Sequence, residues 1–112
     1  MSFWGHEPLA RIDADTAAHE IEQGAQLVDI GEPHDWLTGH LPNAKLVEPE
    51  LVDNALGELS KDTPVIVVSR SPDLAAGCAA FLQDHGMQVA ILDGGPGALV
   101  ASGRALVRPD GS

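Results

Sequence analysis

Four consecutive β-branched residues, Val65 to Val68, constrain the fold of this chain more than any other segment. Pro64 precedes them, a short polar loop follows, and Pro72 opens a helical pattern at once. The apolar run predicts a buried strand, and the abrupt change of period predicts a strand–loop–helix corner. In α/β proteins such corners bind anions or carry nucleophiles. We therefore expect an α/β fold in which the corner that begins at Ser69 lies at the carboxyl end of a buried strand.

The rest of the chain alternates between strand-like and helix-like patterns. We expect short strands over 27–30, 45–47, 65–68 and 89–92, and helices over 14–23, 50–56, 72–85 and 97–102. Asp13 suits the N-cap of the first helix, and Gly24 and Gly86 suit positions just after helix ends. This alternation predicts a mainly parallel sheet of four or five strands with helices on both faces. Three residues are expected at the carboxyl ends of strands: Gly31, Ser69 and Gly94.

The length and the net charge of the chain exclude several classes of function. The 112 residues suggest one domain, and 17 acidic against 6 basic residues give a net charge of −11. Such a surface repels nucleic acid and anionic lipid, and no apolar run is long enough to span a membrane. The single cysteine, Cys78, allows no internal disulfide, and no secretory signal is evident, so we expect a cytoplasmic protein. A protein partner is compatible with these features, but they do not identify one or an oligomeric state.

Two segments carry a family resemblance. Asp29-Ile30-Gly31-Glu32-Pro33-His34-Asp35-Trp36, followed by Gly39-His40-Leu41-Pro42-Asn43-Ala44, resembles the Asp-x-Arg-Glu…Trp…Gly-His-Ile-Pro-Gly-Ala signature of rhodanese-like domains. The strand Val65–Val68, the turn Asp93-Gly94-Gly95 and the closing Gly103-Arg104-Ala105-Leu106-Val107 are similar to that family as well. The resemblance implies a three-layer rhodanese-like fold over residues 10–107, with an N-terminal arm over 1–9 and a C-terminal tail over 108–112.

The resemblance also implies a chemistry, from which this chain departs. Rhodanese-like enzymes transfer sulfur through a cysteine persulfide held in a Cys-x-x-Gly-x-Arg loop. The corresponding loop here is Ser69-Arg70-Ser71-Pro72-Asp73-Leu74. Ser69 replaces the cysteine, Pro72 the glycine and Leu74 the arginine, while Asp73 adds a negative charge. Elsewhere Gly31 replaces the arginine of the first motif, and Leu99 stands where tryptophan is usual. A hydroxyl cannot become a persulfide, because the thiolate is the nucleophile in this chemistry.

We therefore expect a non-catalytic rhodanese-like domain that acts in binding or regulation, with no catalytic residue, cofactor or metal. The alternative is an active thiosulfate or persulfide sulfurtransferase, or an accessory subunit of one. An outlying possibility is a hydrolase that uses Ser69 with His34 or His40, although the Gly-x-Ser-x-Gly elbow is missing. The expected role of Ser69 is to cap the helix or to bond the loop backbone.

Other residues suggest chemistry but favour structural roles. Cys78 lies among small apolar residues at helical spacing, which predicts a buried and inert thiol. A metal site built from His34, Asp35 and His40 with Asp29 or Glu32 has no recognised zinc spacing. The stretch Gly94–Gly97 lacks the lysine of a phosphate loop, so a tight turn is the better interpretation. The remaining histidines are expected on the surface: His6, His19 and His85.

Overall fold

The predicted strand Val65–Val68 forms β4, the central strand of a five-stranded parallel sheet. The computed structural model describes residues 9–33 and 44–101. The strand order is β1-β5-β4-β2-β3, and all four neighbouring pairs are parallel. The other strands are β1 (Ala10–Ile12), β2 (Gln26–Ile30), β3 (Lys45–Val47) and β5 (Val89–Leu92). Parallel pairing places the carboxyl ends of these strands at one edge of the sheet.

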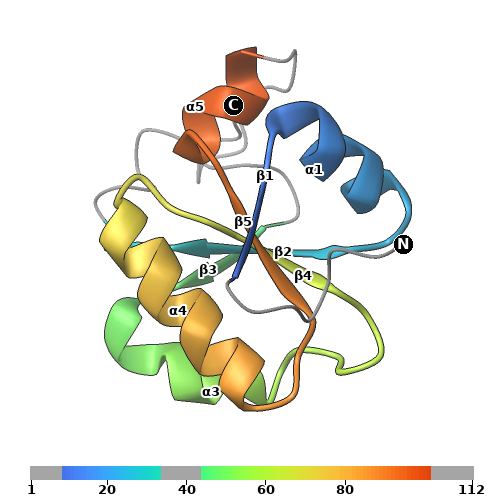
Figure 1. Cartoon of the computed structure of the whole chain (residues 1–112). Helices are drawn as coiled ribbons and strands as arrows, with labels where there is room; N and C mark the ends of the chain where they lie inside the picture. Colours follow the sequence, from blue (N-terminus) through green and yellow to red (C-terminus); the bar gives the residue numbers. More distant parts are fainter. Residues whose placement is uncertain (1–8, 34–43, 102–112) are drawn as a thin grey trace.

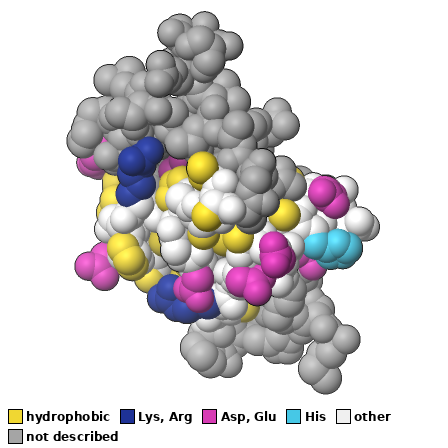
Figure 2. Space-filling model, turned by 90° about the horizontal axis from the view of Figure 1, so that it is seen from above, with side chains coloured by type: hydrophobic (Ala, Val, Ile, Leu, Met, Phe, Trp, Pro, Cys, Tyr) yellow, Lys and Arg dark blue, Asp and Glu magenta, His cyan; other side chains and the backbone are white. Residues whose placement is uncertain are grey.

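Helices cover both faces of the sheet and give three layers. In Figure 1, α1 (Ala14–Glu22) and α5 (Gly95–Ala101) lie above the sheet, and α3 (Val52–Leu56) and α4 (Pro72–Asp84) lie below it. The 3₁₀ helix η1 (Pro49–Leu51) leads directly into α3. Figure 2 looks down on the α1 and α5 side, where hydrophobic side chains lie near the centre of the described surface, with basic side chains on the left and most of the acidic ones toward the right. This architecture confirms the predicted α/β fold.

The alternation of side chains along β4 divides the core in two. Val65 and Val67 pack toward α4, in a cluster that also contains Leu82 of that helix. Ile66 and Val68 point to the opposite face and pack with residues of α1 and α5, Leu99 among them. All four side chains of β4 have no exposed surface. A parallel strand that is buried on both faces requires this continuous apolar sequence, because neither face meets water.

The predicted helix boundaries agree with the structure at several caps. The Asp13 side chain accepts a hydrogen bond from the backbone N–H of Thr16 at 2.8 Å, as an N-cap should. Gly24 and Gly86 have φ angles of 103° and 88°, which fits the left-handed conformation expected after a helix end. The last helix begins at Gly95 rather than at residue 97. No helix in residues 9–33 and 44–101 is long and apolar enough to cross a membrane.

Strand β1 was not among the predicted strands. It contains only three residues, and it pairs along the outer side of β5 with Ala10 opposite Ala90 and Ile12 opposite Leu92. The predicted domain limits after residues 9 and 107 remain predictions. Three parts of the family resemblance lie outside the described residues: His34 to Trp36 of the first motif, the Gly39–Ala44 motif up to residue 43, and the Gly103–Val107 segment.

Candidate functional site

The corner between β4 and α4 is organised by two serines. Ser69 follows the last residue of β4 and is only 6% exposed. Its Oγ accepts a hydrogen bond of 3.0 Å from the backbone N–H of Ser71. Ser71 is the N-cap of α4, and its own Oγ accepts a bond of 3.4 Å from the backbone N–H of Leu74. The prediction that Ser69 bonds the loop backbone is confirmed, whereas the capping role belongs to Ser71.

The turn after β5 lies against this corner. Gly94 and Gly95 have φ angles of 86° and 67°, so both adopt a left-handed conformation that L side chains rarely occupy. A Cβ atom built on Gly95 would meet the carbonyl oxygen of Ser69 at 2.8 Å. The tight-turn interpretation of this glycine pair is therefore confirmed, and Gly95 is needed for the close approach of two backbone segments.

An open cleft of about 280 Å³ lies at this edge of the sheet, between the β4–α4 corner and the turn after β5. Among the residues that line it are Arg11, Ser69, Arg70, Pro72, Asp93 and Gly95. The sequence predicted that Ser69 and Gly94 would lie at this edge, and both line the cleft. Gly31, the third predicted residue, donates its backbone N–H to the Val47 carbonyl at 3.0 Å and is not among the described residues of the lining.

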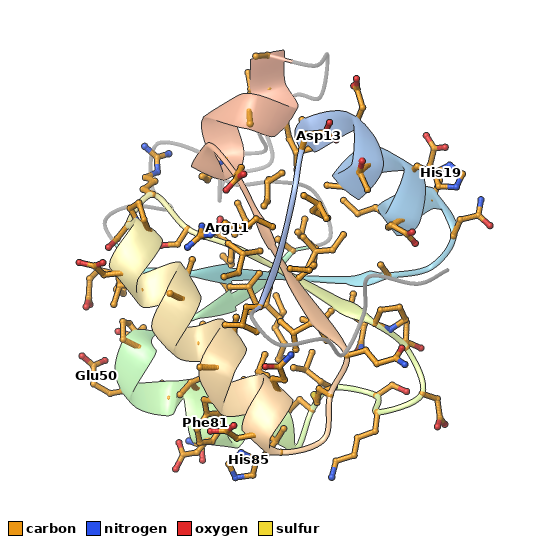
Figure 3. All side chains as sticks on the ribbon, viewed as in Figure 1. Arg11, Asp13, His19, Glu50, Phe81 and His85 are labelled. Atoms are coloured by element: carbon orange, nitrogen blue, oxygen red, sulfur yellow. The ribbon has the colours of Figure 1, made fainter. Side chains whose placement is uncertain are left out.

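Arg11 is the lining residue that sequence reasoning missed. It belongs to β1, and one of its guanidinium nitrogens, Nη1, lies 3.4 Å from Oδ1 of Asp93. Both side chains are more than half exposed, so water screens this ion pair and its contribution to stability is small. Figure 3 shows Arg11 near the carboxyl ends of the strands. Among the residues that the structure describes, the lining of the cleft includes two arginines, Arg11 and Arg70, and one acid, Asp93.

The six residues of the predicted loop do not share one cavity. Ser69, Arg70 and Pro72 line the cleft, but Asp73 and Leu74 line a separate cavity of about 310 Å³. We call this second cavity the apolar groove. Its hydrophobic lining comes from β2, η1, α3 and α4 and consists of Ile30, Pro49, Val52, Leu74, Cys78 and Phe81. Asp73 therefore lines the groove and is not among the described residues that line the cleft.

Cys78 is buried in α4, as predicted, with 4% of its surface exposed. It packs in the same core cluster as Val65 and Val67 of β4. Burial raises the pKa of the Cys78 thiol to about 11, because the low-dielectric surroundings disfavour the thiolate. At neutral pH this thiol is protonated and poorly nucleophilic.

Three carboxylates form a cluster that the sequence did not predict. The side chains of Glu32, Glu48 and Glu50 each offer an oxygen, and these oxygens lie within 4.8 Å of one another. Such a set has donors suited to a hard divalent cation, yet acidic groups often gather on protein surfaces without one. The metal candidates named from the sequence, His34, Asp35 and His40, lie outside the described residues.

The serine hydrolase hypothesis finds no support among the described histidines. His19 is exposed on α1, and His85 is exposed at the end of α4. The Nδ1 atom of His85 lies 2.8 Å from the Phe81 carbonyl, and the two rings are 4.3 Å apart. Figure 3 shows both histidines at the periphery of the molecule, away from Arg11. The two histidines of the original hypothesis, His34 and His40, lie outside the described residues.

The family model and the relatives that match this chain point to the same family. The model of the rhodanese-like domain matches residues 13–101. Thiosulfate sulfurtransferase GlpE of Pseudomonas aeruginosa strain LESB58 is 31% identical over 90 residues, which cover 80% of this chain and 82% of the relative. The relative of the same name from Pseudomonas syringae pv. syringae strain B728a is 30% identical over 86 residues, covering 76% of this chain and 81% of the relative.

Solved structures agree with this result. A thiosulfate sulfurtransferase from Pseudomonas aeruginosa superposes with a TM-score of 0.79 at 27% identity, covering 89% of this chain but only 19% of the larger protein. A rhodanese-related protein from Thermoplasma volcanium superposes with a TM-score of 0.77 at 19% identity, covering 88% of this chain and 97% of its own. The second likeness concerns the fold alone.

Proposed function

This chain belongs to the family of rhodanese-like domains, and from that premise we propose that it is a non-catalytic member that acts in binding or regulation. In this proposal Ser69 occupies the position of the family's persulfide cysteine. The observation that carries the proposal is the environment of two residues: Ser69, which stands at the cysteine position, and Cys78, the one thiol in the sequence. A cytoplasmic location is part of the same proposal, and the single reduced cysteine supports it.

The chemistry of sulfur transfer explains why Ser69 cannot substitute for a cysteine. In the family reaction a thiolate attacks the outer sulfur of thiosulfate, the sulfur–sulfur bond breaks, and sulfite leaves with the electron pair. Cyanide then takes the sulfur as thiocyanate and regenerates the thiolate. A serine hydroxyl is rarely ionised near neutral pH and forms no persulfide. In addition, the Ser69 Oγ already accepts the Ser71 N–H at 3.0 Å, which supports a structural role in the loop.

The only cysteine in the sequence is poorly placed to take over this reaction. Cys78 is 4% exposed, and its side chain is part of the core cluster beneath α4. It borders the apolar groove, not the cleft that contains Ser69. Its raised pKa leaves almost no thiolate at neutral pH. These features support a thiol that contributes to packing rather than to catalysis.

A second candidate function comes from the relatives. The curated proteins at about 30% identity are named thiosulfate sulfurtransferases, which favours an active enzyme or an accessory subunit of one. The cleft also keeps Arg11 and Arg70, and cations of this kind attract a sulfur oxyanion. The absence of a thiol from the cleft residues that the structure describes weighs against this candidate.

A thiosulfate:cyanide assay separates the two candidates. The purified chain should form no thiocyanate above the uncatalysed rate, and Cys78→Ser and Ser69→Ala should behave in the same way. Thiocyanate formation that disappears in Cys78→Ser would assign the nucleophile to Cys78. Formation that disappears in Ser69→Ala would assign it to Ser69. Either result would overturn the proposal.

A further inference from the structure

We propose that the apolar groove between α4 and the η1–α3 segment is the docking surface of this domain, and that it binds a basic amphipathic segment of a partner protein. This inference deepens the binding role proposed above and rests on it. The groove is lined by residues of α3 and α4, the helices drawn below the sheet in Figure 1, whereas the Ser69 cleft has a separate lining. Its occupation therefore requires no chemistry at Ser69.

The shape and lining of the groove fit apolar side chains. Ile30 and Cys78 are almost fully buried and form its base, whereas Val52, Leu74 and Phe81 are partly exposed. A cavity of about 310 Å³ with this lining accommodates one or two apolar side chains from a partner. Partners that dock by helix commonly insert such side chains at a spacing of three or four residues.

The negative charge around the groove favours basic residues in the partner segment that binds there. Asp73 lines the groove itself, and Glu48 and Glu50 flank Pro49, which lines it from η1. Glu32 follows Ile30 by two residues, and its carboxylate clusters with those of Glu48 and Glu50 within 4.8 Å. In Figure 3, Glu50 projects from the η1–α3 side of the molecule that also carries Phe81. A Lys or Arg of the partner that lies near Asp73, Glu48 or Glu50 gains electrostatic attraction at this rim of the groove.

Gly77 supplies a further feature of the docking surface. It lies in the middle of α4, is exposed, and lines the groove. A glycine inside a helix costs about 1 kcal/mol relative to alanine. Packing among the described residues does not require it, because a Cβ at this position would meet none of their atoms within 4 Å. The absence of a side chain leaves the α4 wall open, which permits the close approach of a partner segment.

The test uses the full ¹⁵N-labelled chain and a helical peptide of about twelve residues, with Leu on one face and Lys on the other. Titration should shift the amide signals of Val52, Gly77 and Phe81. A copy of the peptide with Glu in place of Lys, and a copy with Ser in place of Leu, should each bind at least about tenfold more weakly. Raising the salt to about 0.5 M should weaken binding of the basic peptide.

Matched variants localise the binding. Gly77→Trp fills the groove and should reduce affinity at least about tenfold, whereas Gly77→Ala raises helix propensity without filling it and should retain binding. Gly97→Trp on α5, where an added Cβ likewise meets no described atom within 4 Å, controls for a surface tryptophan. Glu50→Lys should weaken binding and Asp62→Lys, a distant exposed acid, should not.

Several outcomes would overturn the docking proposal: no binding, equal binding of the acidic copy, shifts away from the groove, or no effect of Gly77→Trp. The sulfur-transfer assay is independent of all of them. A chain without turnover that also fails to bind the peptide would refute the groove and leave the non-catalytic proposal intact. A chain that forms thiocyanate and also binds the peptide would refute the non-catalytic proposal and leave the groove as a docking surface.

Discussion

The backbone of Gly95 lies directly against the carbonyl oxygen of Ser69, so closely that a Cβ on Gly95 would stand 2.8 Å from that oxygen. This contact joins the turn after β5 to the corner after β4, and it fixes one wall of the cleft. Because Gly95 also has a φ of 67°, a side chain there is disfavoured both by its own backbone conformation and by its neighbour.

The first prediction concerns this contact. Gly95→Ala should lower the free energy of unfolding by about 2 kcal/mol or more, from the left-handed backbone and the clash with Ser69. Gly97→Ala is the matched control, because its Cβ meets no atom of the described part of the chain within 4 Å and alanine favours the helix by up to about 1 kcal/mol. Urea unfolding measures both values. Equal stability of the two variants would show that the close approach is not a constraint.

The second prediction concerns Cys78. Because burial raises its pKa from 9.0 to about 11, the thiolate fraction at pH 8 should be about 100-fold lower than in the unfolded chain. A thiol-reactive dye should therefore label the folded protein at least that much more slowly than the denatured protein. Rapid stoichiometric labelling without denaturant would contradict a buried, inert thiol.

The same pKa gives a dependence of stability on pH. The folded state favours the protonated thiol, because burial disfavours the thiolate. The contribution of Cys78 to the free energy of unfolding is therefore complete below pH 9 and is lost as the pH rises toward 11. The free energy of unfolding should fall across this range by at most about 3 kcal/mol. Cys78→Ala should remove this part of the pH dependence, which chemical unfolding at several pH values would reveal.

The third prediction concerns repair of the loop. Ser69→Cys alone should restore little sulfur transfer. Pro72 at the first turn of α4 offers no N–H to a persulfide, Asp73 adds negative charge to that turn, and Leu74 lies toward the groove instead of supplying a cation. One backbone donor that could stabilise a persulfide at position 69 remains, because the Ser71 N–H already donates to the Oγ of Ser69.

The combined variant Ser69→Cys, Pro72→Gly, Asp73→Asn, Leu74→Arg should exceed the single variant, with effects that do not add because the sites are neighbours. Thiosulfate:cyanide turnover compares the two. If Ser69→Cys alone reached the rate of an ordinary rhodanese, the other three residues would not be the cause of inactivity.

Much of the fold could be predicted from the sequence because local patterns and tertiary packing agree. The apolar run of β4, the cap at Asp13 and the glycine after α4 each specify their structure locally. Strand β1 could not be predicted in this way, since Ala10–Ile12 has no long β-branched run and becomes a strand only by pairing with β5. Arg11 was missed for the same reason.

The site was only partly predictable. The positions of Ser69 and Gly94 follow from parallel strands that end at one edge. The separation of the loop into two cavities depends on where each residue lies around the first turn of α4, with Pro72 toward the cleft and Asp73 toward the groove. A linear motif does not contain that information. The acidic cluster was missed because Glu32 and Glu48 are distant in sequence and meet only through the pairing of β2 with β3.

A non-catalytic role for this domain requires that the folded chain contains no accessible sulfur acceptor. Intact-protein mass spectrometry tests this directly after incubation of the native protein with thiosulfate, without denaturant or reductant. We predict an unchanged mass, because Ser69 forms no persulfide and the Cys78 thiol is buried and protonated. Addition of one sulfur atom that cyanide then removes would contradict the account, and its loss in Cys78→Ser would identify the acceptor.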